Sequence, residues 1–168
     1  VFLFILAIFS IGNSSDAFLI LRATHSPIGM ALFSFLLVYV AFNAISTVVA
    51  FRSGVLSDRI GRKPIILIGW LIFSVSYLGI AMSKTPIGIW VWFTIYGAYY
   101  GMTEGMLKSF AVDLAPANLR GTAVGTFYTI TGIGALPAGL IAGFLWKTVG
   151  HCAPFYYGAV TSLVAALL

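Results

Sequence analysis

The chain has 168 residues, of which 61% are hydrophobic and only 8% are charged, and its mean hydropathy is +1.07. A soluble domain of this size carries about a quarter charged residues, so this composition excludes an ordinary water-soluble protein. The formal net charge is +5, but the basic residues separate apolar segments. This placement favours a role in membrane orientation, and no nucleic-acid partner is expected. The single cysteine, Cys152, excludes an intrachain disulfide and a cysteine metal cluster.

Six apolar segments predict an all-α fold, a single bundle of six transmembrane helices in a lipid bilayer. The segments cover residues 1–22, 28–51, 64–83, 86–112, 120–146 and 153–168, joined by short linkers. At ~1.5 Å per residue, the last segment spans only about 24 Å of a hydrocarbon core ~30 Å thick. Because the chain opens and closes inside apolar runs, we expect a fragment of a longer protein.

The first segment is interrupted by polar residues between Gly12 and Asp16. Polar side chains that face lipid are costly, so we expect Asn13 and Asp16 to face the bundle interior or a water-filled cavity. They are candidates for a substrate or coupling-ion site, and an interhelical hydrogen-bond cluster is an equally favoured alternative. Asn43 in the second segment is a further candidate, although hydrogen bonding between helices is favoured there. The third segment, after Pro64, is almost wholly apolar and is expected to be a lipid-facing scaffold.

The fourth segment combines a glycine stripe with a pair of charges. Gly97, Gly101 and Gly105 recur every four residues, a spacing that allows another helix to approach closely. Glu104 and Lys108 lie one turn apart on nearly the same face. A buried carboxylate this far from the helix end favours a binding or coupling role slightly over a structural ion pair.

The most distinctive stretch is GVLSDRIGRKP, which begins at residue 54 and is predicted to be a tight polar loop (residues 52–63) between two membrane helices. This stretch resembles the loop signature G-x-x-x-D-R-x-G-R-[RK] of the major facilitator superfamily. The stretches SSDAFLILRA, YGAYYGMTEG and PANLRGTAVG resemble the carboxy-terminal six helices of bacterial permeases of that superfamily. The matching loop residues are Gly54, Asp58, Arg59, Gly61, Arg62 and Lys63.

The resemblance implies a secondary active transporter that moves a small-molecule substrate by alternating access. The partner would be a missing amino-terminal six-helix half of the same chain, or a second copy. The resemblance also implies a cytoplasmic gate in which Asp58 meets the start of the fifth helix near Arg120, while Arg62 pairs with Asp113. From the residues alone, Asp113 could pair with either Arg59 or Arg62.

The distribution of basic residues predicts the orientation of the bundle. Six lie towards the face that carries the loop signature and three towards the other, so residues 52–63 are expected in the cytoplasm. A bacterial inner membrane is the expected location. The two groups are Arg52, Arg59, Arg62, Lys63, Lys108 and Arg120, and on the opposite face Arg22, Lys84 and Lys147.

Two other functions are considered. A non-transporting membrane receptor or partner subunit on a transporter-like scaffold remains the alternative, because a fold does not determine a function. An intramembrane enzyme is not expected, since the chain has no H-E-x-x-H, no G-x-S-x-G and no acidic metal cluster. No cofactor or metal is expected. Asp16 and Glu104, if either titrates, could couple transport to protons.

Overall fold

The computed structural model describes residues 2–14, 16–25 and 28–168, and these ranges contain helices and turns but no strand. The expected all-α fold is therefore confirmed for the described residues. Residues 1 and 15 of the predicted first segment lie outside them. The elements are α1 (Phe2–Gly12), α2 (Asp16–Thr24), α3 (Leu32–Ile60), α4 (Arg62–Met82), α5 (Pro86–Asp113), the 3-10 turn η1 (Ala117–Leu119), α6 (Arg120–Thr148) and α7 (Ala153–Leu167).

Four stretches of the described chain are long and apolar enough to cross a membrane, judged by length and composition. The helix α5 is long enough, but its glycines and tyrosines lower its hydropathy, and α7 has only 15 residues. The prediction of six transmembrane helices is thus supported for four stretches and stays a prediction for α5 and α7. The four stretches are Phe2–Thr24, Leu32–Ile60, Arg62–Met82 and Ala117–Thr148.

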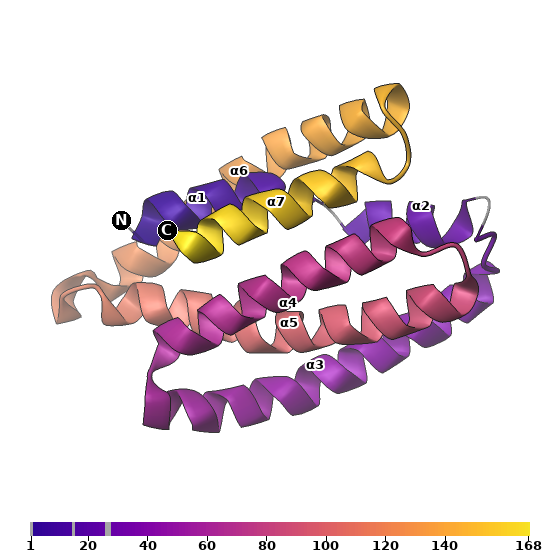
Figure 1. Cartoon of the computed structure of the whole chain (residues 1–168). Helices are drawn as coiled ribbons and strands as arrows, with labels where there is room; N and C mark the ends of the chain where they lie inside the picture. The colour runs from indigo at the N-terminus through magenta and orange to yellow at the C-terminus, as the bar shows by residue number, and fades with distance from the viewer. Residues whose placement is uncertain (1, 15, 26–27) are drawn as a thin grey trace.

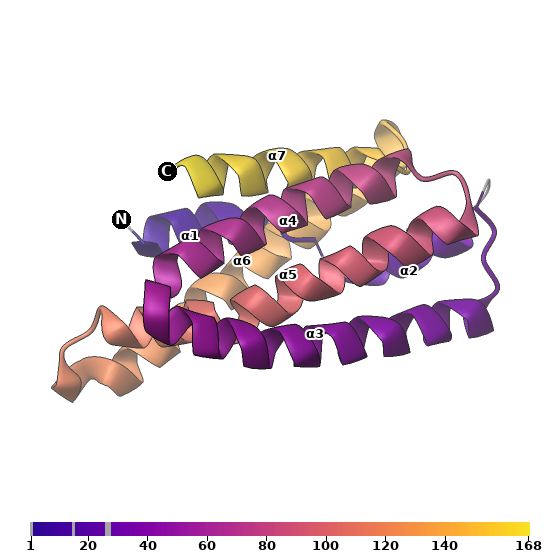
Figure 2. The same ribbon diagram turned by 60° about the horizontal axis from the view of Figure 1, so that its bottom comes forward.

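The helices form an elongated bundle in which α5 packs against both α3 and α4 (Figure 1). The helix α7 lies along α4, and α1 lies against α6 and α7, as the second view also shows (Figure 2). The described ends of the chain lie at the same end of the bundle (Figure 1). This arrangement leaves one side of α5, between α3 and α6, less covered than the side that meets α4.

Two glycines permit the close approach of α5 to α3. A Cβ atom on Gly97 would lie 2.9 Å from the carbonyl oxygen of Phe42, and one on Gly101 would overlap the carbonyl group of Ser46. No atom of a neighbour lies within 4 Å of the corresponding position on Gly105. The predicted close contact is therefore confirmed for the first two glycines and wrong for the third, whose Cβ position faces open space.

The helix α4 is enclosed on one face and exposed on the other, so the prediction of a lipid-facing segment fits only one of its faces. Trp70, Phe73 and Tyr77 are buried, whereas the opposite face carries the exposed side chains of Ile68, Leu71, Val75 and Leu78. Two serine hydroxyls join α4 to α7: Ser74 donates to the carbonyl oxygen of Ala159, and Ser162 donates to that of Trp70, each over 2.9 Å. An apolar side chain suits contact with lipid and contact with another helix equally, so hydropathy could not separate the two environments.

The signature at residues 54–63 is mostly helical, so the predicted polar loop is much shorter than expected. The helix α3 continues through Ile60 and α4 begins at Arg62, with only Gly61 between them. Gly61 has φ of 86°, a conformation in which a Cβ atom would be strained, and its N–H donates to the carbonyl oxygen of Ser57 over 2.9 Å. Polar side chains do not stop a helix, so the turn needs only the glycine.

Candidate functional site

Three of the residues predicted to bind substrate or a coupling ion, Asn13, Glu104 and Lys108, line one cavity of about 530 Å³. Its walls come mainly from α1, α5 and α6, with Ala50 of α3, and we refer to it as the α1–α5–α6 cavity. The remaining lining is mainly aromatic and hydroxyl-bearing, and it includes Tyr99, Tyr100, Thr103, Phe127, Tyr128 and Thr131. The cavity therefore combines one carboxylate, one ammonium group and stacking surfaces.

Glu104 is exposed in this bundle, which corrects the prediction that it is buried. Its carboxylate accepts a hydrogen bond of 3.1 Å from the hydroxyl of Tyr100 on the preceding turn. Lys108 is also exposed, and no ion pair joins it to Glu104, since the described residues contain only the Arg62–Asp113 pair. Both charges remain available to a ligand because both line the α1–α5–α6 cavity and neither forms an ion pair among the described residues.

A second, smaller cavity of about 250 Å³ adjoins the first on the α3 side. Glu104 and Tyr100 line both cavities, and the α3 residues Ser46, Thr47 and Ala50 form the other wall of the smaller one. The carboxylate of Glu104 therefore lies between two open spaces, a position that suits contact with a solute or with water.

The break between α1 and α2 places its polar residues in three different environments. Asn13 reaches the α1–α5–α6 cavity, whereas Ser14 is buried, with its Oγ atom 3.5 Å from the hydroxyl of Tyr77. Asp16 lies at the first residue of α2, where the helix dipole favours a carboxylate, and it is exposed. The buried Tyr96 donates a hydrogen bond of 3.1 Å to Asp16. The expectation of an interior or cavity position thus fits Asn13, while Asp16 is exposed at the residue level but directs its carboxylate to the buried Tyr96.

Asn43 hydrogen bonds within its own helix rather than between helices, contrary to the favoured prediction. Its side-chain nitrogen donates to the carbonyl oxygen of Tyr39 over 2.8 Å. Its own carbonyl oxygen accepts from the hydroxyls of Ser46 and Thr47. Asn43 is exposed on α3 and is not among the residues that line the α1–α5–α6 cavity.

The tyrosines that connect these groups were not predicted from the sequence, because tyrosine is also common at membrane–water interfaces. The ring centroids of Tyr77 and Tyr96 are 5.8 Å apart, and those of Tyr96 and Tyr99 are 5.3 Å apart. Tyr96 and Tyr100 each donate to a carboxylate. The signal was the YGAYYG run, which lies within the glycine stripe and one turn before Glu104.

At the end of the bundle that carries the signature, Arg62 and Asp113 form an ion pair with 2.7 Å between Nε and Oδ2. This is one of the two pairings that the sequence left open for Asp113. The side chains keep 31% and 50% of their accessible surface, so water reaches the pair. Asp58 and Arg59 are exposed on the last turn of α3, and the described chain gives them no ion pair.

Arg120 is exposed at the first residue of α6. The described residues show no ion pair or hydrogen bond between Asp58 and the start of α6. The contact that the family resemblance implied for this aspartate therefore stays a prediction.

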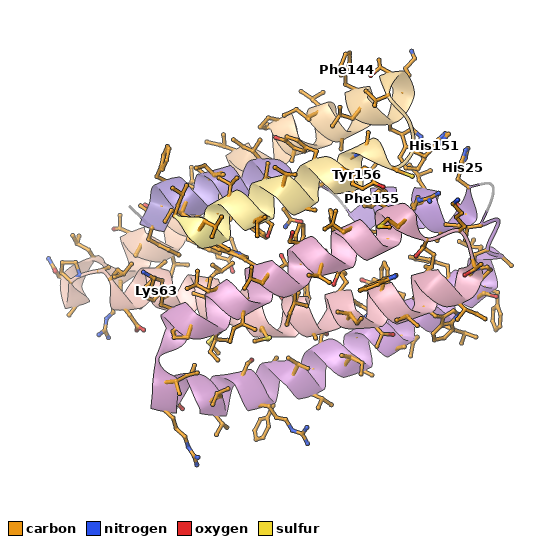
Figure 3. The ribbon with its side chains drawn as sticks, viewed as in Figure 1. His25, Lys63, Phe144, His151, Phe155 and Tyr156 are labelled. Atoms are coloured by element: carbon orange, nitrogen blue, oxygen red, sulfur yellow. The ribbon has the colours of Figure 1, made fainter. Side chains whose placement is uncertain are left out.

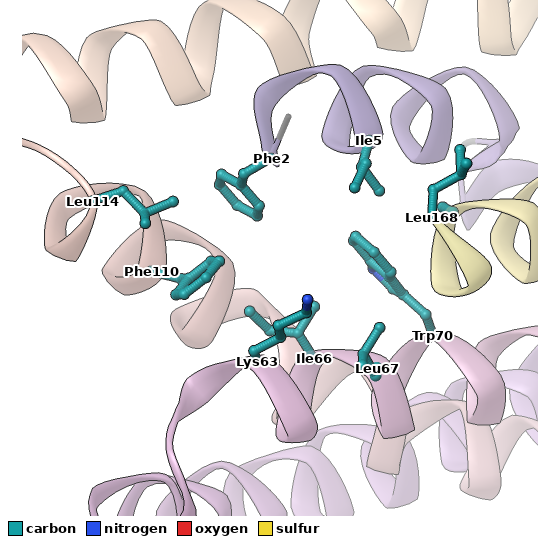
Figure 4. Close-up of a pocket in the computed structure, with 10 residues that line it drawn as sticks. Phe2, Ile5, Lys63, Ile66, Leu67, Trp70, Phe110, Leu114 and Leu168 are labelled. Atoms are coloured by element: carbon teal, nitrogen blue, oxygen red, sulfur yellow. The ribbon is translucent and has the colours of Figure 1, made fainter.

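Lys63, the last residue of the signature, lies beside an apolar cavity of about 370 Å³ at the same end of the bundle. Figure 4 shows its ammonium group among Phe2, Phe110, Ile66 and Trp70. The adjacent arginine and lysine of the signature thus diverge, since Arg62 meets a carboxylate while Lys63 lies against an apolar pocket.

Comparison with known proteins gives matches that cover the whole chain. The family model described as Major Facilitator Superfamily matches residues 1–168. An uncharacterized MFS-type transporter of Methanocaldococcus jannaschii is 36% identical over 171 residues, which covers 99% of this chain and 43% of that protein.

Two resistance proteins are also similar. The quinolone resistance protein NorA of Staphylococcus aureus is 26% identical over 132 residues, which is 79% of this chain and 34% of that protein. The class H tetracycline resistance protein of Pasteurella multocida is 28% identical over 148 residues, covering 87% of this chain and 34% of that protein. The chain thus spans less than half the length of these relatives.

Proposed function

Because the chain belongs to the major facilitator superfamily, we propose that it is part of a secondary active transporter that moves a small solute by alternating access. The observation that carries this proposal is the exposure of Glu104 and Lys108 on an otherwise apolar bundle. A charged side chain facing the bilayer centre costs about 2.5–3.5 kcal/mol even on the insertion scales that give the lowest values. The two charges therefore favour a water-filled pathway at this face.

We propose that a second bundle covers this face, either an amino-terminal six-helix half of the same chain or a second copy. The length of the relatives supports the first arrangement, since this chain spans 43% of the M. jannaschii protein. Transporters built from such repeats bind their cargo near the bilayer midplane, between the repeats. In this arrangement all six helical segments, including α5 and α7, span the membrane as one domain.

The cavity chemistry suggests an organic solute with an aromatic or other flat apolar part. Tyr99, Tyr100, Phe127 and Tyr128 supply ring faces, and Glu104 supplies a carboxylate. Two of the similar proteins are named for resistance to quinolones and to tetracycline, and a solute of comparable size fits the cavity of about 530 Å³. Asp16 and Glu104 are the candidates for proton coupling, because protonation would remove the charge that each tyrosine hydroxyl stabilises.

The ion pair between Arg62 and Asp113 is the candidate gate. A partly exposed pair contributes about 0.2–1 kcal/mol, so it can break during a transport cycle at little cost. Asp58, Arg59 and Lys63 lie at the same end and would complete the charge cluster. The excess of basic residues supports a cytoplasmic position for this end, in the inner membrane of a prokaryotic cell.

Accessibility of the cavity from both membrane faces tests the proposal. The full-length protein is reconstituted into sealed vesicles with Cys152→Ser and Asn13→Cys, and a membrane-impermeant maleimide is added from one side or the other. Alternating access predicts that the cysteine of Asn13→Cys is labelled from either side of the membrane. A bound solute should change the ratio of labelling from the two sides. A cysteine at the fully buried Ser76 serves as the control and should react from neither side.

Labelling of Asn13→Cys from one side alone, unchanged by any solute, would contradict alternating access. It would favour the alternative function, a non-transporting receptor or partner subunit. Under that alternative, Glu104→Gln would change partner binding or folding without changing solute flux.

A further inference from the structure

A cavity of about 440 Å³ lies at the end of the bundle opposite the signature. It is bounded by Arg22 near the end of α2, by Met82 at the end of α4 and Lys84 after it, and by His151 and Tyr156 before and within α7. Figure 3 labels His151 and Tyr156 in this region, far along the bundle from Lys63. This cavity shares no lining residue with the α1–α5–α6 cavity.

Arg22 is a buried charge that no carboxylate compensates. Its side chain is only 4% exposed. One of its terminal nitrogens donates to the carbonyl oxygens of Ala81 and Ser83, over 3.2 and 2.7 Å, while its Nε atom has no hydrogen-bond partner among the described residues. The two carbonyls belong to the end of α4, where the helix dipole supplies a partial negative charge but no full counter-charge. A buried ion without a partner is costly.

The other permanently charged side chain of this cavity is also positive. Lys84 adds a second cation, and His151 lines the same cavity. His25 packs against His151 with 3.8 Å between ring centroids and 35° between the ring planes, and the ring of Trp146 packs against both. All four acidic residues of the chain lie outside this cavity: Asp16, Asp58, Glu104 and Asp113.

We propose that this cavity binds a phosphate-type anion between Arg22 and Lys84. Guanidinium and ammonium groups are the preferred protein partners of phosphate oxygens, and the anion would supply the missing counter-charge. The apolar side of the cavity, with the exposed side chains of Met82 and Tyr156, continues into the exposed apolar surface of α7 at Val160. The anion can therefore come from the headgroup of an acidic phospholipid or from free phosphate.

Binding of phosphatidylglycerol to the detergent-purified protein, measured by native mass spectrometry, tests the proposal. Phosphatidylcholine is the matched lipid without net charge. We expect phosphatidylglycerol to bind more tightly, Lys84→Gln to weaken its binding about fivefold, and Arg22→Gln to weaken it further. Arg22→Lys keeps the charge and should retain most of the binding if folding is preserved. Lys147→Gln, at the same end but outside the cavity, is the control and should leave binding unchanged.

A titration with inorganic phosphate separates the two sources. Displacement of phosphatidylglycerol by millimolar phosphate would support a free-anion site, and retention of the lipid would support a headgroup site. Equal binding of the two lipids together with no binding of phosphate would overturn the proposal. Equal losses of phosphatidylglycerol binding in Lys84→Gln and Lys147→Gln would also overturn it. Such a result would attribute the binding to general surface charge, and the role of Arg22 would then be to cap the carboxyl end of α4.

Discussion

The contact between α3 and α5 makes a sharp prediction for Gly101→Ala. The added Cβ atom would overlap the carbonyl oxygen of Ser46 and lie 3.0 Å from the backbone nitrogen of Ala50. Both neighbours are backbone atoms, so no side-chain rotation relieves the overlap and the two helices must separate. Overpacking costs about 1–3 kcal/mol, while alanine gains about 1 kcal/mol over glycine in helix propensity. The difference is a fall of up to about 2 kcal/mol in the free energy of unfolding of Gly101→Ala.

Gly105→Ala on the same helix is the matched control. Its Cβ atom would meet no neighbour within 4 Å, so the variant keeps the propensity gain, up to about 1 kcal/mol, without the overlap. Unfolding in detergent micelles, followed by circular dichroism, compares the two variants under identical conditions. Equal stability of the two variants would refute the reasoning, because it would show that α3 and α5 do not pack through this glycine.

Three further variants test other contacts. Ser162→Ala removes a hydrogen bond to α4 and should cost about 0.6 kcal/mol in the same unfolding assay, whereas Ser76→Ala removes a bond within its own helix and should cost less. The double variant Arg62→Asp with Asp113→Arg exchanges the two charges and should recover most of the transport that either single change removes. A flux in the double variant no higher than in the single variants would argue against a gate. Asp58→Asn should lower the transport rate more than the unfolding temperature, because Asp58 is exposed; parallel losses of folded protein and flux would contradict this expectation.

The all-α fold and the family could be predicted from sequence, since they depend on hydrophobic run length and on one short motif. The partner of Asp113 could be narrowed to Arg59 or Arg62, because charged residues are rare in this chain, and the structure shows that it is Arg62. The extent of the loop could not be predicted. Polar residues at 52–60 mark the end of the hydrocarbon region, but a helix continues past that boundary until a residue such as Gly61 allows a turn.

The environment of each helix face could not be predicted, because a membrane segment is apolar on every side. The half-enclosed α4 and the partly uncovered α5 differ in their neighbours more than in their composition. Glu104 was expected to be buried because it lies well inside a helix, yet it faces two cavities beside α5. The tyrosines were missed for a related reason, since only packing places Tyr96 beside Asp16.

The charges that the bundle leaves without an opposite charge indicate where other molecules must approach. The chain has nine basic and four acidic residues, and one ion pair forms among the described residues. Water can stabilise the exposed charges near the helix ends, such as Arg59 and Lys147. Arg22 is only 4% exposed, so little water reaches it, and water can reach Glu104 and Lys108 only if their face of α5 is kept away from lipid. A bound anion and a second bundle are the proposed partners of these two places, and each proposal answers a different desolvation cost.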